Sequence, residues 1–154
     1  MRKSIILMAL LVCMSVFAFA QTVDPSLRGL DNAIKRVSKD IIKNVPDNAR
    51  IVIIPTDSQD KTIRDYINGE LELLVVEQGF RVTERAQLRK IIAEQNFQLG
   101  WEVDENTAVS IGKITGATFM LVSCVDGEGN LRRLRAKIMD VTTGEIVGVA
   151  TGRF

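Results

Sequence analysis

The side chains best suited to bind a ligand follow the first strand that the sequence predicts. This strand, at residues 50–55, is a short apolar run rich in β-branched residues, and Asp57, Ser58 and Asp60 come directly after it. Ligands of α/β proteins often bind at the carboxyl ends of parallel strands, so these three residues form a candidate ligand loop. The alternative interpretation is that they cap the next helix and are solvated.

The remaining side chains give little support for enzyme chemistry. The sequence contains no histidine, which removes the usual general base near neutral pH and the commonest transition-metal ligand. Cys124 stands in an apolar segment, so we interpret it as a buried structural thiol and not as a nucleophile. The acidic, glycine-containing segment 126–130 lacks the ligand spacing of a calcium loop and is predicted to be a hairpin turn. We therefore expect a protein that is not an enzyme and has no cofactor or metal.

Two groups of side chains are candidates for a partner-binding surface. Phe97 and Trp101 lie in the connection between two predicted helices, and aromatic residues in loops often anchor interfaces. The alternative is that both pack under the loop as an extension of the core. Arg133, Arg135 and Lys137 alternate along a predicted strand and form a basic stripe that suits an acidic partner. A solvated strand face is the alternative for this stripe.

Hydrophobic periodicity predicts the α/β framework that carries these candidates. Helices are predicted at residues 27–45, 62–78, 85–97 and 104–116. Strands are predicted at residues 50–55, 80–83, 117–125, 131–141 and 145–153. In the fourth helix, Ala108, Ile111 and Ile114 are expected to face inward. The order of elements indicates an α/β fold with a mixed sheet of about five strands, helices packed on it and a C-terminal antiparallel meander. The first two strands are expected to be joined by a right-handed crossover.

The first 20 residues are typical of a cleavable secretory signal peptide. Arg2 and Lys3 precede an apolar stretch at residues 5–17, and a small-x-small triplet ends at Ala20. The apolar stretch is shorter than the roughly 20 residues that a membrane-spanning helix needs. Cys13 follows a valine, where a lipid-carrying cysteine would follow a small residue, so lipid attachment is not expected.

Cleavage after the signal peptide, residues 1–20, would leave a nearly neutral single domain at residues 21–154. The basic residues fall from 20 to 18 against 19 acidic ones, so nucleic acid is not an expected partner. Cys124 is the one cysteine in this range, which excludes an internal disulfide. We predict an exported, periplasmic protein that is soluble, not lipid-anchored, and has no transmembrane span. The sequence leaves open whether the protein forms a homo-oligomer.

Several segments resemble a known family of cell-envelope proteins. Residues 82–95 join a strand end to a helix that begins Arg-x-x-Leu and closes with Glu-Gln. An acidic cap at residues 104–105 is followed by Ile-Gly-Lys-x-x-Gly-Ala at residues 111–117, and the closing hairpin at residues 139–146 also fits. From Ile51 to the C-terminus, the chain resembles the family that contains the curli-secretion protein CsgG and the penicillin-binding-protein activator LpoB.

This resemblance implies a non-enzymatic accessory protein of the cell envelope. Members of the family bind and regulate wall-synthesis enzymes or form part of a secretion apparatus at the outer membrane. The sequence has no long amphipathic hairpins of the kind that a secretion pore needs. We therefore expect a domain that binds an envelope protein, such as a peptidoglycan synthase or envelope assembly machinery. A small-ligand-binding module that uses Asp57, Ser58 and Asp60 is the alternative function.

Overall fold

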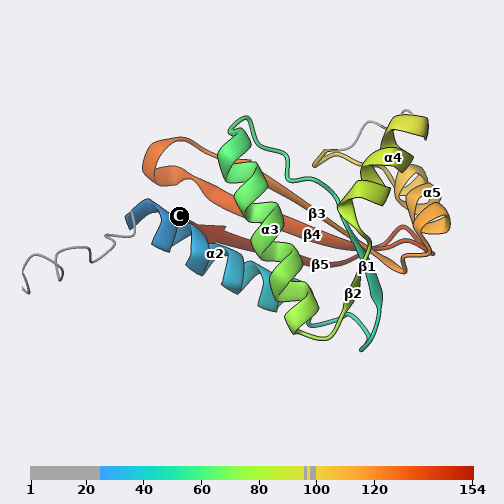
Figure 1. The fold of residues 1–154 in the computed structure, drawn as a ribbon. Helices are drawn as coiled ribbons and strands as arrows, with labels where there is room; N and C mark the ends of the chain where they lie inside the picture. Colours follow the sequence, from blue (N-terminus) through green and yellow to red (C-terminus); the bar gives the residue numbers. More distant parts are fainter. Residues whose placement is uncertain (1–24, 96, 98–99) are drawn as a thin grey trace, which may run out of the picture.

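The computed structural model shows one mixed α/β arrangement and describes residues 25–95, 97 and 100–154 (Figure 1). The predicted signal peptide lies outside the described residues. The elements are α2 (Pro25–Ile41), β1 (Arg50–Ile53), α3 (Lys61–Glu77), β2 (Arg81–Val82), α4 (Arg85–Gln95), α5 (Glu105–Thr115), β3 (Phe119–Asp126), a short 3-10 helix (Gly129–Leu131), β4 (Arg133–Asp140) and β5 (Ile146–Arg153). None of the helices in these ranges combines the length and apolar character that crossing a bilayer requires.

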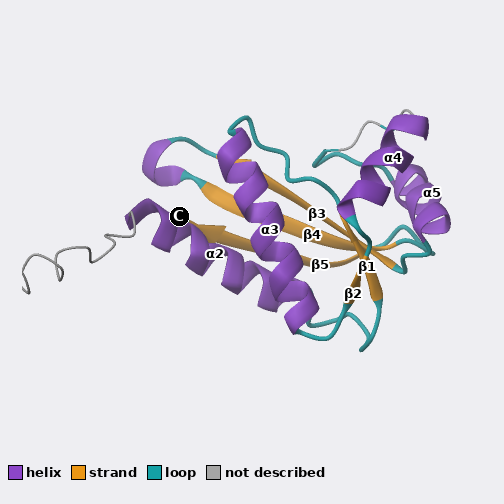
Figure 2. Cartoon of the chain, in the orientation of Figure 1, coloured by secondary structure: helices purple, strands orange, loops and turns teal. Residues whose placement is uncertain are grey.

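Five strands form one sheet in the order β2-β1-β3-β4-β5 (Figure 2). β1 runs parallel to both β2 and β3, and β3, β4 and β5 follow one another as an antiparallel meander. This topology confirms the predicted α/β fold with a mixed sheet and a C-terminal meander. The parallel strand β1 is buried on both faces, as its continuous apolar sequence predicts.

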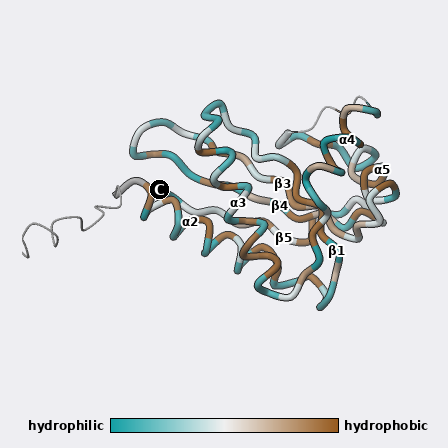
Figure 3. The backbone as a smooth tube through the Cα atoms, in the orientation of Figure 1, coloured by the Kyte–Doolittle hydropathy of each residue, from teal (hydrophilic) through white to brown (hydrophobic). Residues whose placement is uncertain are grey.

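The helices divide between the two faces of the sheet. α2 and α3 pack on one face around a core that includes Ile34, Ile67 and Ile138. The amphipathic pattern of α2 is visible as alternating hydrophilic and hydrophobic segments (Figure 3). α4 and α5 cover part of the other face around a smaller core that includes Met120 and Ile111. On that face α5 contacts β3, whereas α2 on the opposite face contacts β4 and β5.

Aspartate side chains cap the N-termini of α3 and α5. Asp60 accepts hydrogen bonds from the backbone N–H groups of Thr62 and Ile63 at the start of α3. Asp104 accepts one from the N–H of Thr107 at the start of α5. Each carboxylate satisfies donors that a helix leaves unpaired in its first turn. Asp60, one of the three candidate ligand residues, is thus a helix cap.

The inward face of α5 differs from the predicted one. Ile114 was expected to face the sheet, but it is 45% exposed, and Gly112 and Thr115 are buried in its place. The reason is a close approach to the chain between β4 and β5. A Cβ atom at Gly112 would lie 2.4 Å from Cγ2 of Val141, so the side of α5 that carries Gly112 is the side that docks.

The first helix is shorter than predicted. α2 ends at Ile41, whereas the apolar spacing extends to Val45. Val45 is still buried, because the chain turns after the helix and its N–H donates to the Ile42 carbonyl at 3.0 Å. The spacing of apolar residues therefore extends beyond the helix, because the turn that follows packs on the same core.

Candidate functional site

The structure brings residues from both candidate groups together around one cavity. This cavity, which we name the Trp101 cavity, has a volume of about 640 Å³ and lies where β1 and β3 end. Asp57 and Ser58 of the candidate ligand loop line it together with Trp101 and Arg135 of the candidate partner surface. Asp60 lies outside its lining and borders a separate cavity of about 460 Å³.

Backbone pairing holds Asp57 at the edge of the Trp101 cavity. Asp57 forms a parallel bridge to Cys124 beyond the end of β1. Its N–H donates to the Ser123 carbonyl, and its carbonyl accepts from the Val125 N–H, both at 2.9 Å. The start of the candidate ligand loop is therefore an extension of the sheet.

A buried polar network lies directly behind this position. The Asn68 side-chain oxygen accepts from the Thr56 N–H at 2.9 Å and from the Thr56 hydroxyl at 2.7 Å. The Thr56 hydroxyl also lies 2.8 Å from the Ser123 hydroxyl. All three residues are buried, so these bonds tie α3, the end of β1 and the centre of β3 together without help from solvent.

Trp101 covers part of the predicted basic stripe. The Arg135 guanidinium carbon lies 4.9 Å from the centre of the Trp101 ring, and the Lys137 ammonium nitrogen lies 5.1 Å from it. Both are cation–π contacts. Trp101 and Phe97 also pack against the smaller core as partly buried residues. The stripe is therefore not a fully solvated face, and the aromatic loop both extends the core and presents a surface.

The three cations of the stripe have different electrostatic partners. Arg133 and Arg135 pair with Asp126 at 2.7 and 3.1 Å. Burial alone would raise the pKa of Asp126, but hydrogen bonds from the two arginines hold it below its usual value. Lys137 has no carboxylate within salt-bridge distance among the described residues, and partial burial lowers its pKa. Lys137 is thus the cation of the stripe that is available to a carboxylate of a partner.

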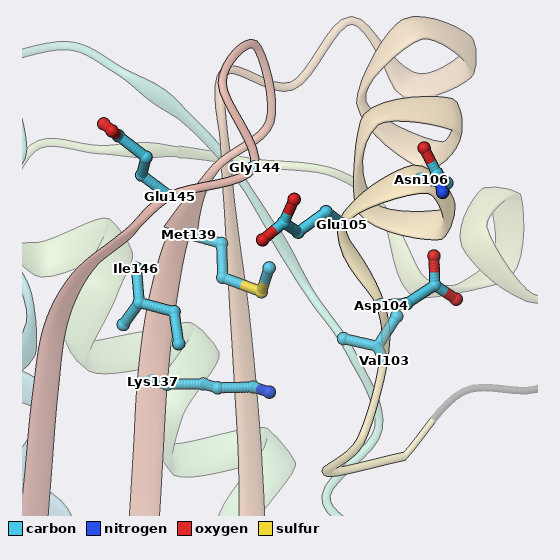
Figure 4. A pocket seen from close by; sticks show the side chains of 9 residues that line it. All are labelled: Val103, Asp104, Glu105, Asn106, Lys137, Met139, Gly144, Glu145 and Ile146. Carbon is cyan, nitrogen blue, oxygen red and sulfur yellow. The ribbon is translucent and has the colours of Figure 1, made fainter.

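A second cavity of about 590 Å³ adjoins the first, between the start of α5 and the turn from β4 to β5 (Figure 4). Val103 lines both cavities. Lys137 and Ile146 lie side by side on neighbouring strands in Figure 4, and the Glu105 side chain lies near Gly144. The sequence singled out Lys137 in this group and missed Val103 and Ile146, because nothing in an ordinary strand or loop pattern marks them.

Exposed apolar side chains continue this region across β5. Ile146 is 53% exposed and Val149 is 64% exposed. Val149 lies opposite Lys137 in the β4–β5 register, and Ile146 lies opposite Met139, so they share the face of the sheet that carries α5. We name the continuous region of Trp101, Lys137, Ile146 and Val149 the open sheet surface. It combines an aromatic side chain, a lysine that forms no salt bridge within the described ranges and two exposed aliphatic side chains.

The described residues do not suggest a metal centre. No group of three or more aspartate, glutamate or cysteine side chains in the described ranges is arranged to hold an ion.

The surroundings of Cys124 are those of a structural thiol. It is 7% exposed, and burial raises its pKa from 9.0 to about 11. The reactive thiolate is therefore about a hundredfold scarcer than for an unperturbed thiol at the same pH. We expect iodoacetamide to alkylate Cys124 at pH 8 at least about 100-fold more slowly than in the urea-unfolded chain, with a rate that rises about tenfold per pH unit up to pH 10. A rate that levels off below pH 9, measured by mass spectrometry, would contradict this assignment.

Comparisons with known proteins agree with the resemblance seen in the sequence. The family model described as curli production assembly/transport component CsgG matches residues 71–127. The LpoB C-terminal domain from Salmonella enterica has a TM-score of 0.68 at 17% identity, covering 81% of this chain and 97% of that one. The LpoB C-terminal domain from Escherichia coli gives a TM-score of 0.66 with the same identity and coverage. The lipoprotein GNA1162 from Neisseria meningitidis gives 0.56 at 15% identity, covering 68% of this chain and 81% of that one. No curated protein sequence matches the chain.

Proposed function

This chain is CsgG/LpoB-like in its fold and in the segment that the family model matches, and from that premise we propose that it is a non-enzymatic accessory protein of the cell envelope. In this proposal it is exported to the periplasm and binds another envelope protein, such as a peptidoglycan synthase or a component of envelope assembly machinery. LpoB is a penicillin-binding-protein activator, which makes a wall-synthesis enzyme a natural partner to test first.

The observation that carries the proposal is the open sheet surface. Trp101 lies over Lys137, and Ile146 and Val149 are both more than half exposed on the same face. Stable protein interfaces are enriched in aromatic anchors that are surrounded by apolar and polar contacts. An exposed apolar patch with an aromatic residue and a lysine has the composition of such an interface.

Replacing Trp101 with alanine is expected to weaken partner binding at least tenfold, because a central aromatic anchor typically contributes about 2 kcal/mol or more. A photocrosslinking amino acid at Val149 should capture the partner in cells, and Trp101→Ala should reduce the yield of that crosslinked product. The matched control is the same photocrosslinker at Ile114, which is also exposed but lies on α5. Equal products from positions 149 and 114, or a yield at Val149 that is unaffected by Trp101→Ala, would reject the proposed surface.

The Trp101 cavity favours a second candidate function, the binding of a small ligand. Asp57, Ser58 and Arg135 place polar groups around the cavity, and Trp101 adds an aromatic wall. Small-ligand sites commonly combine these features. Thermal-shift screening of nucleotides, sugars and wall fragments tests this function, with Asp57→Ala as the variant that should abolish a positive shift. A screen with no shift for any compound would remove this candidate.

A further inference from the structure

The strand next to the open sheet surface is a free edge. Among the described strands, β5 pairs with β4 alone. The Phe154 N–H donates to the Arg132 carbonyl at 3.1 Å, which fixes the direction of the hydrogen bonds along this pair. Because that direction alternates in antiparallel strands, every second residue from Gly148 to Gly152 points its backbone groups toward β4. The residues between them point theirs away from the sheet.

Three outward-pointing residues are available for further pairing. Val149, Thr151 and Arg153 are all exposed. Their outward N–H and C=O groups have no hydrogen-bond partner in the part of the chain that the structure describes. The protein uses one outward group itself, since the Asn44 side-chain amide donates to the Val147 carbonyl at 3.0 Å. This bond shows that the outward groups of β5 lie within reach of an added donor.

α2 packs on the face of β5 that is opposite to the open sheet surface. A Cβ atom at Gly152 would lie 2.8 Å from the Ala33 Cα, and one at Gly148 would lie 2.8 Å from the Ile41 carbonyl oxygen. α2 therefore covers the face of β5 to which Gly148 and Gly152 belong. The side chains of Val149 and Thr151 project from the other face, where they remain exposed.

The charge around this edge favours an acidic occupant. The face that carries Val149 is basic along β4 and β5. By the strand register it holds Arg133, Arg135, Lys137 and Arg153, against Asp126 at the end of β3 and Glu145 just before β5. A second copy paired through a two-fold axis would place this basic edge against itself, which disfavours self-pairing.

We infer that the partner contributes an extended, acidic segment that pairs with the free edge of β5 as a sixth strand. This inference rests on the proposed function, because it specifies the chemistry of a partner at the open sheet surface. In strand addition, main-chain hydrogen bonds supply affinity and alternate side chains supply specificity. Acidic side chains at alternate positions of the added strand would lie along the face that carries Arg153 and Lys137, and the apolar ones between them would lie on the face that α2 covers.

The test uses the full chain, exported by its expression host and purified, and a synthetic eight-residue peptide of alternating glutamate with valine or threonine. One control peptide carries N-methyl groups on alternate amides and cannot complete the strand pairing. The other has lysine in place of glutamate. The acidic peptide is expected to bind at least tenfold more tightly than either control and to slow amide hydrogen exchange at Val149 and Thr151 at least tenfold.

Val149→Pro removes one outward N–H without breaking a bond to β4, and proline is tolerated at such edge positions. It is expected to weaken peptide binding at least tenfold, whereas Val149→Ala keeps the N–H and should bind within about threefold of the original chain. Thermal unfolding of both variants checks that they fold. If Val149→Pro does not fold, the effect of the acidic peptide on amide hydrogen exchange in the unmodified chain decides whether the peptide pairs with β5.

Three outcomes would overturn the inference. The first is equal binding of the acidic and N-methylated peptides. The second is unchanged exchange at Val149 and Thr151 in the presence of the acidic peptide. The third is a dimer that forms with increasing protein concentration in sedimentation and that Val149→Pro disrupts. Such a dimer would show that a second copy of the chain occupies the edge.

If the acidic peptide does not bind while the crosslink at Val149 still depends on Trp101, strand addition is rejected and the proposed function stands. If the peptide binds but no Trp101-dependent crosslink forms, the proposed partner surface fails instead.

Discussion

Replacing Gly152 with valine is expected to lower the free energy of unfolding by about 3 kcal/mol, at the upper end of the usual cost of overpacking. A Cβ atom at this position would lie 2.8 Å from both Cα and Cβ of Ala33 and 3.0 Å from its carbonyl oxygen. Backbone atoms cannot rotate out of the way, so α2 would have to move off β5. Valine is otherwise favourable in a strand, which makes a large loss of stability diagnostic of this contact.

Urea denaturation followed by circular dichroism measures this loss. The matched control is Gly69→Ala in α3, where the nearest atom to an added Cβ is Arg85 Nη2 at 3.9 Å. Alanine replaces glycine inside a helix there without a clash, so stability should rise by about 0.5–1 kcal/mol. If Gly152→Val unfolds at the same urea concentration as the original chain, α2 does not pack directly on β5.

Much of the fold follows from hydrophobic spacing alone. Leu134, Ala136 and Ile138 alternate along β4 with the three cations of the basic stripe, as expected of a strand with one buried face, and all three are fully buried. The glycines of β5 could not be interpreted in the same way. Gly148 and Gly152 are unfavourable in a strand taken by itself. Their role is visible only once α2, more than a hundred residues earlier in the chain, is seen to lie against them.

The candidate site was predictable as separate residues but not as an arrangement. Asp57, Trp101 and Arg135 each stood out by type and position in the sequence. Their convergence on one cavity depends on the bridge from Asp57 to Cys124 and on the path of the chain after α4. These are long-range contacts, and no local pattern encodes them. The predicted site roles themselves stay predictions until the binding experiments are done.

The exposure of Ile146 and Val149 shows a second limit of predicting structure from the sequence. A run of apolar residues in a strand is typical of burial on one or both faces. Whether a face is covered depends on where the helices of another part of the chain pack. α5 packs beside β3, so the same pattern that gives a buried strand in β3 leaves two exposed side chains in β5.

Replacing Asn68 with leucine is expected to cost about 3 kcal/mol of stability. Leucine is similar in size, but it cannot accept the bonds that the Thr56 N–H and hydroxyl donate to Asn68 at 2.9 and 2.7 Å. Leaving a buried polar group without a partner costs about 1–3 kcal/mol, and this substitution removes the acceptor of both Thr56 donors. Ser123→Ala is the matched control, because Thr56 keeps both bonds to Asn68 and the expected cost is about 1 kcal/mol.

The same substitution tests whether the network positions the Trp101 cavity. Thr56 immediately precedes Asp57, whose backbone pairs with β3 beside Cys124. Loss of the Asn68 bonds should therefore loosen this part of the sheet first, and Cys124 alkylation in the folded chain should accelerate more in Asn68→Leu than in Ser123→Ala. Urea titration and the alkylation rate separate the two effects. A loss of stability with no difference in alkylation would mean that the network stabilises the core without setting the position of the candidate loop.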